Sequence, residues 1–377
     1  MSESLFKRNT ISRTKLENRL KRNSSIWLCE DEDEVYIKYD FNIKIPSDFE
    51  FTEGTYPVGP RKTYRVKDCW IIGRRGAVFD QNHSLILESV GSNFERFFNR
   101  RRFLLNGYYT RTTANMISDS TYKEPIINRE YDEVFPLISI YHQGYYFWLL
   151  EYLPKLRGLE QYSQKRDSTP PILVQPNPPK YMIESLALAG YGQTDIIEWH
   201  GQCSFVNSII LSQHRIRKFS GKGPQGFDYN PSIKDIEWVR KRLTRNIKRG
   251  GYDRIYISRQ NAKRGRKISN YESLEDKLSK RGFQSVCLEK LPFEKQVEIC
   301  ANADVIIGPH GAGLTNMIFS TNAKIFEIFN DKFLKPSYCL LAHECGHDYY
   351  HYIGDTADEV NIRVDIEEFL KLIDNNL

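Results

Sequence analysis

The second half of the chain alternates short apolar runs with amphipathic segments, and this pattern constrains the fold more than any other feature. Strands that alternate with helices across short loops build parallel sheets with helices on both faces. We therefore predict an α/β protein with a doubly wound parallel sheet in this half. The expected strands are 254–258, 283–288, 305–307 and 324–328, and the expected helices are 233–247, 271–280, 292–301, 336–345 and 366–373.

The first half combines two patterns. Residues 70–87 read as strands separated by turns, which predicts a β-meander. A second α/β unit is expected after it, with strands at 134–140, 172–174, 195–199 and 208–211 and a helix at 181–189 that ends at Gly190. The segment 221–226 is the most linker-like in the chain because it is rich in glycine. We divide the chain into a basic arm (1–25), an N-terminal domain (26–222), a C-terminal domain (223–360) and a C-terminal helix (361–377).

Composition narrows the classes of protein. The chain has 377 residues, 40% hydrophobic and 27% charged, which suits a soluble protein with two cores. A net charge of +6 is too mild to indicate nucleic-acid binding. The seven cysteines contain no CxxC pair and indicate free thiols in a reducing compartment. With no signal-peptide pattern and no apolar run of a membrane span, we expect a cytoplasmic protein.

The basic arm leaves two interpretations open. Residues 1–25 are polar and contain seven lysines and arginines. A solvated surface arm is one interpretation, and peripheral contact with an anionic membrane surface is the other.

A Gly-rich turn follows the apolar strand at 305–307. Glycines at this point let the backbone bend sharply and approach a ligand closely. The helix expected from Leu314 begins with free amides and the positive end of its dipole, which favours an anion. An ordinary tight turn is the alternative, although it needs fewer glycines and no cluster of donors. The glycines are Gly308, Gly311 and Gly313, and the side-chain donors are His310, Thr315 and Asn316.

Charged residues follow the neighbouring strands. The strand at 254–258 leads into Arg259 and a basic loop that includes Arg266, while Glu289 and Glu327 belong to two other strand ends. Ligands of open α/β sheets bind at the carboxyl ends of strands. Arginine forks suit a diphosphate and carboxylates suit ribose hydroxyls, so this pattern favours a nucleotide-diphosphate site. A solvated basic loop and, less favoured, an RNA contact are the alternatives.

A carboxylate lies within an apolar helix of the first half. Glu151 belongs to a segment that is apolar on nearly every side, which predicts a buried helix. A buried carboxylate is costly unless it is paired or used in chemistry. Either Glu151 forms an ion pair with Lys155 or Arg157, or it has a functional role.

Several of these segments resemble glycosyltransferase family 61. They are YYFWLLEYLPKL (145–156), IYISR (255–259), the segment 288–319 with HGAGLTN, and IFEIF (325–329); with the meander, the likeness spans about residues 65–355. The resemblance implies a GT-B arrangement of two Rossmann-like domains with parallel sheets, the nucleotide sugar being held by the C-terminal domain. It also implies inverting transfer of the sugar to a hydroxyl group of a glycan.

The same resemblance implies roles for individual residues. Glu151 would be the general base for the acceptor hydroxyl, and His310 is the second catalytic candidate. Glu289 and Glu327 would contact ribose or support the turn. The nucleotide and its diphosphate would be held by Arg259, Arg266, Gly308, His310, Gly311, Ala312, Gly313, Leu314, Thr315 and Asn316.

The resemblance also implies the partners: a nucleotide sugar, for which we expect a UDP-sugar, as donor and a glycan or lipid-linked glycan as acceptor. We expect no essential cofactor. Two positions depart from the family pattern. Phe147 stands where the family usually has histidine, with His142 as a substitute five residues earlier, and Tyr271 follows Asn270 where glutamate is common. A protein that binds nucleotide sugars without transferring them is therefore the alternative function.

Two motifs suggest a metal without strong support. Residues 343–347 match HExxH, with His351 as a third possible ligand, but a zinc site of this type needs a continuous helix and Gly346 is expected to end it. Asp31 to Asp33 superficially match DxD, but they precede a strand at 35–39 instead of following one. We expect no essential metal.

Overall fold

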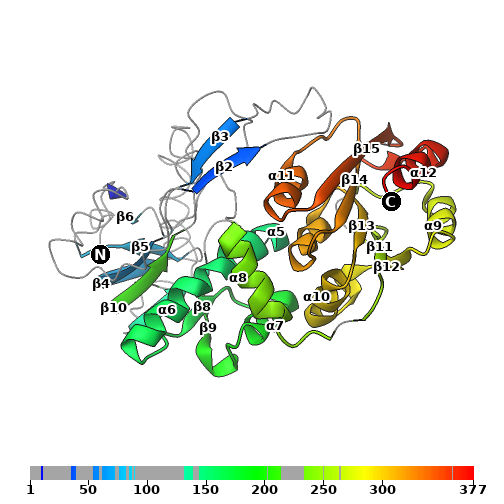
Figure 1. Ribbon diagram of the computed structural model, residues 1–377. Helices are drawn as coiled ribbons and strands as arrows, with labels where there is room; N and C mark the ends of the chain where they lie inside the picture. Colours follow the sequence, from blue (N-terminus) through cyan, green and yellow to red (C-terminus); the bar gives the residue numbers. More distant parts are fainter. Residues whose placement is uncertain are drawn as a thin grey trace. The chain divides into compact units, whose positions relative to one another are not determined.

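The computed structural model describes residues 10–11, 35–39, 54–58, 62–72, 76–81, 85–86, 89, 131–138, 144–201, 203–213, 233–248, 250–262, 265–358 and 360–377 (Figure 1). The chain divides into two compact units. Unit 1 comprises Met1–Tyr36 and Pro57–Lys218, and unit 2 comprises Ile37–Tyr56 and Phe219–Leu377. A pair of strands, β2 (Val35–Tyr39) and β3 (Gly54–Val58), forms a sheet of its own.

Unit 2 is built on a six-stranded sheet of order β12-β11-β13-β14-β15-β16. All neighbours from β12 to β15 are parallel, and β16 is antiparallel to β15. The predicted parallel arrangement is therefore confirmed for the five strands from β12 to β15, whereas β16 makes the sheet as a whole mixed. The strands are β11 (Arg254–Ile257), β12 (Gln284–Val286), β13 (Val305–Pro309), β14 (Lys324–Asn330), β15 (Asp348–Thr356) and β16 (Ile362–Arg363).

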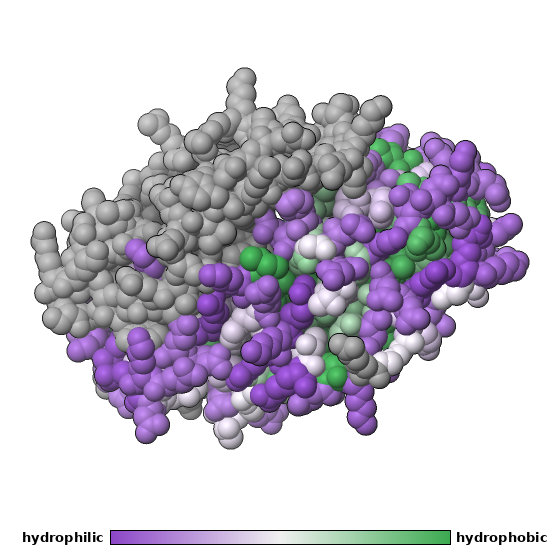
Figure 2. Space-filling view, in the orientation of Figure 1, coloured by the Kyte–Doolittle hydropathy of each residue, from purple (hydrophilic) through white to green (hydrophobic). Residues whose placement is uncertain are grey.

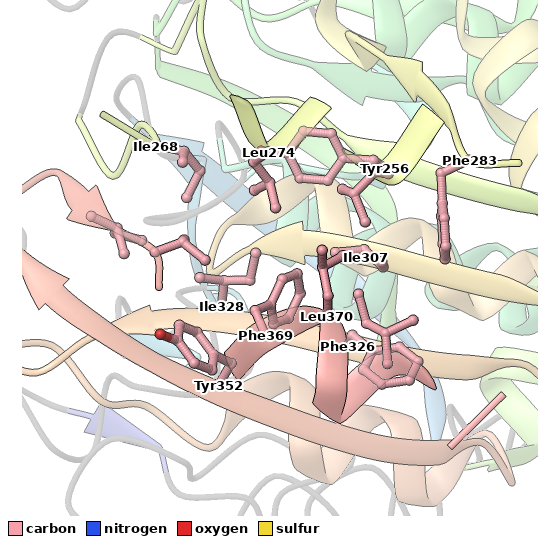
Figure 3. Packing of buried hydrophobic residues seen from close by; sticks show 14 of the residues in the cluster. Tyr256, Ile268, Leu274, Phe283, Ile307, Phe326, Ile328, Tyr352, Phe369 and Leu370 are labelled. Atoms are coloured by element: carbon pink, nitrogen blue, oxygen red, sulfur yellow. The ribbon is translucent and has the colours of Figure 1, made fainter. Parts of the chain in front are cut away.

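Helices cover both faces of this sheet. On one face, Leu274 of α9 (Tyr271–Ser279) and Phe369 and Leu370 of α12 (Ile366–Asp374) pack against Ile307 and Phe326 of the strands (Figure 3). Asp365 precedes α12, and its side chain accepts a hydrogen bond from the amide of Glu368 at 3.1 Å and so caps the helix. Four other helices of the unit pack against one another: α8 (Ile233–Thr244), α10 (Phe293–Ala301), the 3₁₀ helix η7 (Ala312–Phe319) and α11 (Ser337–Glu344).

β15 and β16 were not predicted. β15 reads DYYHYIGDT and contains a single aliphatic residue, Ile353, so it lacks the run of β-branched residues that marks a central strand. β15 pairs with β14 over seven residues, and this pairing stabilises a strand that its own sequence does not predict.

Unit 1 is built on an eight-stranded sheet of order β1-β6-β5-β4-β10-β7-β8-β9. The run β4-β5-β6 is antiparallel, which confirms the meander, and β10-β7-β8-β9 is parallel. β4 and β10 pair in antiparallel fashion over most of their length. The strands are β1 (Thr10–Ile11), β4 (Thr63–Ile72), β5 (Ala77–Phe79), β6 (Leu85–Ile86), β7 (Tyr131–Pro136), β8 (Ile172–Val174), β9 (Ile196–Glu198) and β10 (Cys203–Ser212).

This sheet is mixed, which corrects the expectation of parallel sheets in both domains. The reason is the long β4–β10 pair, which joins segments far apart in the sequence and so leaves no local signal. Its core includes Tyr64, Ile71, Val134, Trp199 and Ile209. The helical segments that the structure describes in unit 1 are α5 (Tyr145–Phe147), the π-helix η3 (Trp148–Tyr152), the 3₁₀ helices η4 (Leu153–Lys155) and η5 (Gln193–Asp195), α6 (Leu156–Arg166) and α7 (Lys180–Leu188).

The surface of the described residues is mainly hydrophilic on the face shown in Figure 2, with hydrophobic residues in separate small patches. No described helix has both the length and the apolar character needed to cross a bilayer. Some predictions fall outside the described residues: nearly all of the basic arm, Asp31 to Asp33, His142 and the linker at 221–226.

Candidate functional site

Two neighbouring strands of unit 2 define where a ligand can sit. Numbered within the unit, its parallel strands run 2-1-3-4-5 across the sheet, so the chain leaves β11 toward β12 and later returns to β13 on the other side. Helical connections diverge from such a switch point and leave a crevice at the carboxyl ends of the two strands. Arg259 follows β11, and His310 and Gly311 follow β13. The structure thus brings the predicted cationic and Gly-rich segments together.

The guanidinium of Arg259 lies directly on Gly311. A Cβ atom at Gly311 would be 1.9 Å from Nη1 of Arg259 and 2.6 Å from Cζ, so no larger residue fits there unless Arg259 moves. Nη2 of Arg259 donates to the carbonyl of Gly265 at 3.4 Å, while its buried Nε has no hydrogen-bond partner among the described residues. An unsatisfied buried donor is costly, and an anionic ligand would satisfy it.

The turn itself packs closely on β11. A Cβ at Gly308 would be 3.3 Å from Cβ of Ile257, and one at Gly313 would be 3.0 Å from its Cγ2, so these two glycines allow the approach of turn and strand. The expected helix after the turn is the 3₁₀ helix η7. Its first residues, Ala312 and Gly313, are half-buried and offer backbone to a ligand.

The next three residues of the motif are enclosed. Leu314 is 1% exposed, and Thr315 and Asn316 are 0% exposed. The side chain of Asn316 donates to the carbonyl of Gly313 at 2.9 Å. In this arrangement these residues stabilise the turn from its buried side. They contribute to ligand binding by fixing the conformation of the turn and not by direct contact.

His310 is held by a buried carboxylate. Its Nδ1 lies 2.5 Å from Oε1 of Glu327, and Oε2 of Glu327 accepts a hydrogen bond of 2.5 Å from the hydroxyl of Tyr349. Glu327 is 0% exposed, so of its two expected roles the geometry fits support of the turn and not ribose contact. Tyr349 was not predicted as a site residue because its strand, β15, was not predicted.

Aromatic and basic side chains surround this edge. The His310 ring stacks on Phe329 with centroids 5.2 Å apart and meets Tyr338 and Phe333 edge-on. Arg266, whose φ is 59°, lies with Cζ 5.2 Å from the centroid of Phe333. In the sequence, these aromatic residues could not be distinguished from ordinary core residues.

Burial and neighbouring charges shift the pKa of Arg259. Burial is the main cause that lowers the pKa of Arg259, and the charge of Arg266 lowers it further. Glu289, exposed on η6 (Leu288–Lys290) after β12, acts in the opposite direction. Arginine remains cationic under such shifts, so Arg259 and Arg266 supply positive charge at the crevice.

Glu151 lies in unit 1, within the π-helix η3. It is 1% exposed, and every other residue of η3 is also buried. Burial, and then the charge of Glu151, raise the pKa of the nearby Tyr146. Single π turns inside helices are frequent at functional sites because they redirect side chains. Phe147, one residue before this turn, is half-buried and meets the Tyr146 ring edge-on at 5.5 Å.

The HExxH segment does not form a zinc site. α11 ends at Glu344, and Gly346 has a left-handed φ of 72°, as expected for the end of a helix. His347 accepts from the amide of Ala323 at 3.1 Å through Nδ1 and donates to the carbonyl of Met317 at 2.9 Å through Nε2. Both ring nitrogens are therefore occupied, and burial lowers the pKa of His347 to about 4.

His347 precedes β15, at the edge of the sheet where the parallel strands begin. The candidate ligand residues lie at the opposite edge, where these strands end.

Comparison with known proteins bears on these features. Residues 145–325 match the family model described as Glycosyltransferase 61. The resemblance to glycosyltransferase family 61 is confirmed. The matched region begins at α5, includes Glu151, Arg259 and the Gly-rich turn, and ends at the start of β14.

Curated relatives agree with the family match. An EGF domain-specific O-linked N-acetylglucosamine transferase of Drosophila melanogaster is 42% identical over 79 residues, which cover 20% of this chain and 15% of the relative. A beta-1,2-xylosyltransferase of Arabidopsis thaliana is 34% identical over 99 residues, 25% of this chain and 18% of the relative. The chain thus spans less than a fifth of each relative's length. Family and relatives support the prediction of a glycosyltransferase.

Proposed function

We propose that the chain transfers a sugar from a nucleotide-diphosphate sugar to a hydroxyl group of a glycan, with inversion at the anomeric carbon. The observation that carries this proposal is the guanidinium of Arg259 lying on Gly311 at the switch point between β11 and β13, with its buried Nε unsatisfied. A diphosphate would supply the anionic oxygens to which Nε of Arg259 can donate a hydrogen bond.

The donor side of the proposal uses cations and backbone amides. Arg259 and Arg266 meet the charge of the leaving diphosphate, and the amides at the start of η7 add donors and a favourable dipole. We propose a UDP-sugar as donor, and we propose that these cations replace an essential metal ion. The relatives are named for N-acetylglucosamine and xylose, so their names favour no single sugar.

The acceptor side of the proposal uses Glu151. As the acceptor oxygen attacks the anomeric carbon, its proton passes to the Glu151 carboxylate and the bond from that carbon to the diphosphate oxygen breaks. The electron pair of the broken bond leaves with the diphosphate. A GT-B arrangement, in which each unit supplies one side of the reaction, is part of this proposal and rests on the family resemblance.

A second candidate is a protein that binds the nucleotide sugar without transferring it. Phe147 favours it, because an aromatic hydrocarbon with no proton to donate or accept stands where the family usually has histidine. In the structure its ring packs against Tyr146.

A donor screen tests both candidates. The purified chain is incubated with UDP-N-acetylglucosamine, UDP-xylose and other UDP-sugars, with and without a chelator, and with glycan acceptors. Release of UDP and an inverted anomeric configuration of the product by NMR support transfer. Calorimetric binding of a UDP-sugar with no release of UDP supports the second candidate. Binding of no UDP-sugar or other nucleotide sugar contradicts both.

A further inference from the structure

Three polar side chains from neighbouring strands form a connected chain behind the candidate donor site. His310 follows β13, Glu327 lies in β14 and Tyr349 lies in β15. We propose that Glu327 and Tyr349 are positioning residues, which orient His310 so that its Nε2 donates a hydrogen bond to the leaving diphosphate. This inference rests on the proposed function for the identity of the ligand.

The hydrogen bonds fix which nitrogen of His310 is available. A carboxylate only accepts hydrogen bonds, so the hydroxyl of Tyr349 donates to Oε2 and Nδ1–H of His310 donates to Oε1. Burial, and then the charge of Glu327, raise the pKa of Tyr349, which keeps its hydroxyl protonated and able to donate. Both oxygens of Glu327 are thereby engaged, and Nδ1 of His310 is committed to the interior.

The position of the ring directs the other nitrogen outward from that carboxylate. Nδ1 points to Glu327, which is 0% exposed, so Nε2 on the far side of the ring points away from it. Stacking on Phe329 at an interplanar angle of 26° and edge contacts with Phe333 and Tyr338 fix the plane of the ring. His310 also directly precedes Gly311, on which Arg259 lies. Nε2 of His310 and the guanidinium of Arg259 therefore lie at the same edge of the sheet, where the parallel strands end.

Glu327 supplies charge as well as direction. A fully buried carboxylate is costly without a positive partner, and among the described residues Glu327 forms its ion pair with His310. When Nε2 also carries a proton, the imidazolium is balanced by this carboxylate and Nε2–H is free to bond a phosphate oxygen. Partners that orient a functional histidine through its second nitrogen are well known at metal sites, and here the same logic serves an anion.

The test compares ligands that differ only in phosphate. Calorimetry measures UDP and uridine binding to the full chain and to Glu327→Gln, Tyr349→Phe and His310→Gln. We expect UDP affinity to fall about tenfold in Glu327→Gln and His310→Gln and about threefold in Tyr349→Phe, while uridine affinity changes by less than about twofold. Tyr350→Phe is the matched control, because Tyr350 lies on the same strand but stacks on Phe326 on the opposite face of the sheet. This substitution should leave both affinities unchanged.

A second measurement needs no ligand. Nitrogen-15 NMR of the imidazole rings, with His310→Gln for assignment, should show a protonated Nδ1 at His310 in the native chain and an altered signal in Glu327→Gln and Tyr349→Phe. Equal losses of UDP and uridine affinity, or a His310 signal that ignores both substitutions, would overturn the positioning role. If the native chain bound neither UDP nor uridine, the proposed function would fail, and with it the phosphate contact. Should Glu327→Gln not fold, Tyr349→Phe decides both measurements.

Discussion

The two large sheets, one in each unit, place their candidate residues in different ways. In unit 2 the strands from β12 to β15 are all parallel, so their carboxyl ends share one edge and bring Arg259, His310 and Gly311 together. In unit 1 the sheet is mixed, and its candidate, Glu151, comes from a π turn within a helix instead of a strand end. A parallel sheet concentrates function at a predictable edge, whereas a mixed sheet has no such edge and depends on a local irregularity.

The largest expected effect separates the roles of the two units. Glu151→Gln should lower the rate of sugar transfer about 10²- to 10⁴-fold, because the acceptor proton loses its base, while UDP affinity stays unchanged. Transfer is measured by product formation and UDP binding by calorimetry. Glu160→Gln on α6 is the control; Glu160 is half-buried, in contrast to the fully buried Glu151, and the variant should keep its activity. A Glu151→Gln protein with native transfer rates would remove Glu151 from the mechanism.

Arg259 tests the donor edge of unit 2. Arg259→Lys keeps the charge but loses the planar fork, so UDP affinity should fall about 10- to 100-fold by calorimetry. Arg281→Lys is a matched control in the same unit, because Arg281 forms a two-pronged pair with Asp374 at 2.8 and 2.9 Å on α12. That substitution should leave UDP affinity unchanged. Equal effects of the two substitutions would show that the Arg259 fork has no special part in binding.

The opposite edge of the unit 2 sheet should show a pH effect on stability without an effect on binding. His347 has a folded pKa of about 4, below its ordinary value of 6.5, so the unfolded chain takes up a proton that the folded chain excludes. The stabilisation is complete above pH 6.5 and is lost as the pH falls toward 4, by about 2 kcal/mol. His351, whose pKa is also lowered by burial, adds in the same direction.

Urea unfolding of the native chain and of His347→Asn between pH 7 and pH 4.5 measures this effect. The variant should be less stable at pH 7 and lose less unfolding free energy on acidification. Parallel curves for the two proteins would mean that His347 titrates normally in the fold.

The smallest expected effect distinguishes backbone from side-chain binding in the turn. Thr315 is 0% exposed and its hydroxyl has no hydrogen-bond partner among the residues that the structure describes. Thr315→Val should therefore raise the free energy of unfolding by about 1 kcal/mol and leave UDP affinity within about twofold. A tenfold loss of UDP affinity would show instead that the turn rearranges so that the hydroxyl reaches the ligand.

Much of unit 2 could be predicted because its signals are local. The helices at 271–280 and 292–301 and the strands at 305–307 and 324–328 are found within a few residues of their expected bounds. Convergence of Arg259 with the Gly-rich turn follows from parallel strands alone. The tyrosine behind His310 could not be found, because the polar and aromatic pattern of β15 does not resemble a central strand.

Unit 1 was harder to predict for a different physical reason. The antiparallel pairing of β4 with β10 joins Thr63 to Ser212, and no short-range pattern records a contact of that separation. The burial of Glu151 followed from its apolar neighbours, but the π turn around it depends on backbone geometry that the residue types do not encode.

We propose that a nucleotide diphosphate binds where Arg259 lies on Gly311, and a single calorimetric titration can test this binding. UDP is titrated into the native chain, Gly311→Ala and the control Gly192→Ala, whose added Cβ would come no closer than 3.8 Å to any atom outside its own immediate neighbours. The added Cβ at Gly311 would lie 1.9 Å from Nη1 of Arg259 and displace the guanidinium. We predict at least about a tenfold loss of UDP affinity in Gly311→Ala and none in Gly192→Ala. Native UDP affinity in Gly311→Ala would show that the diphosphate does not bind at Arg259 and Gly311.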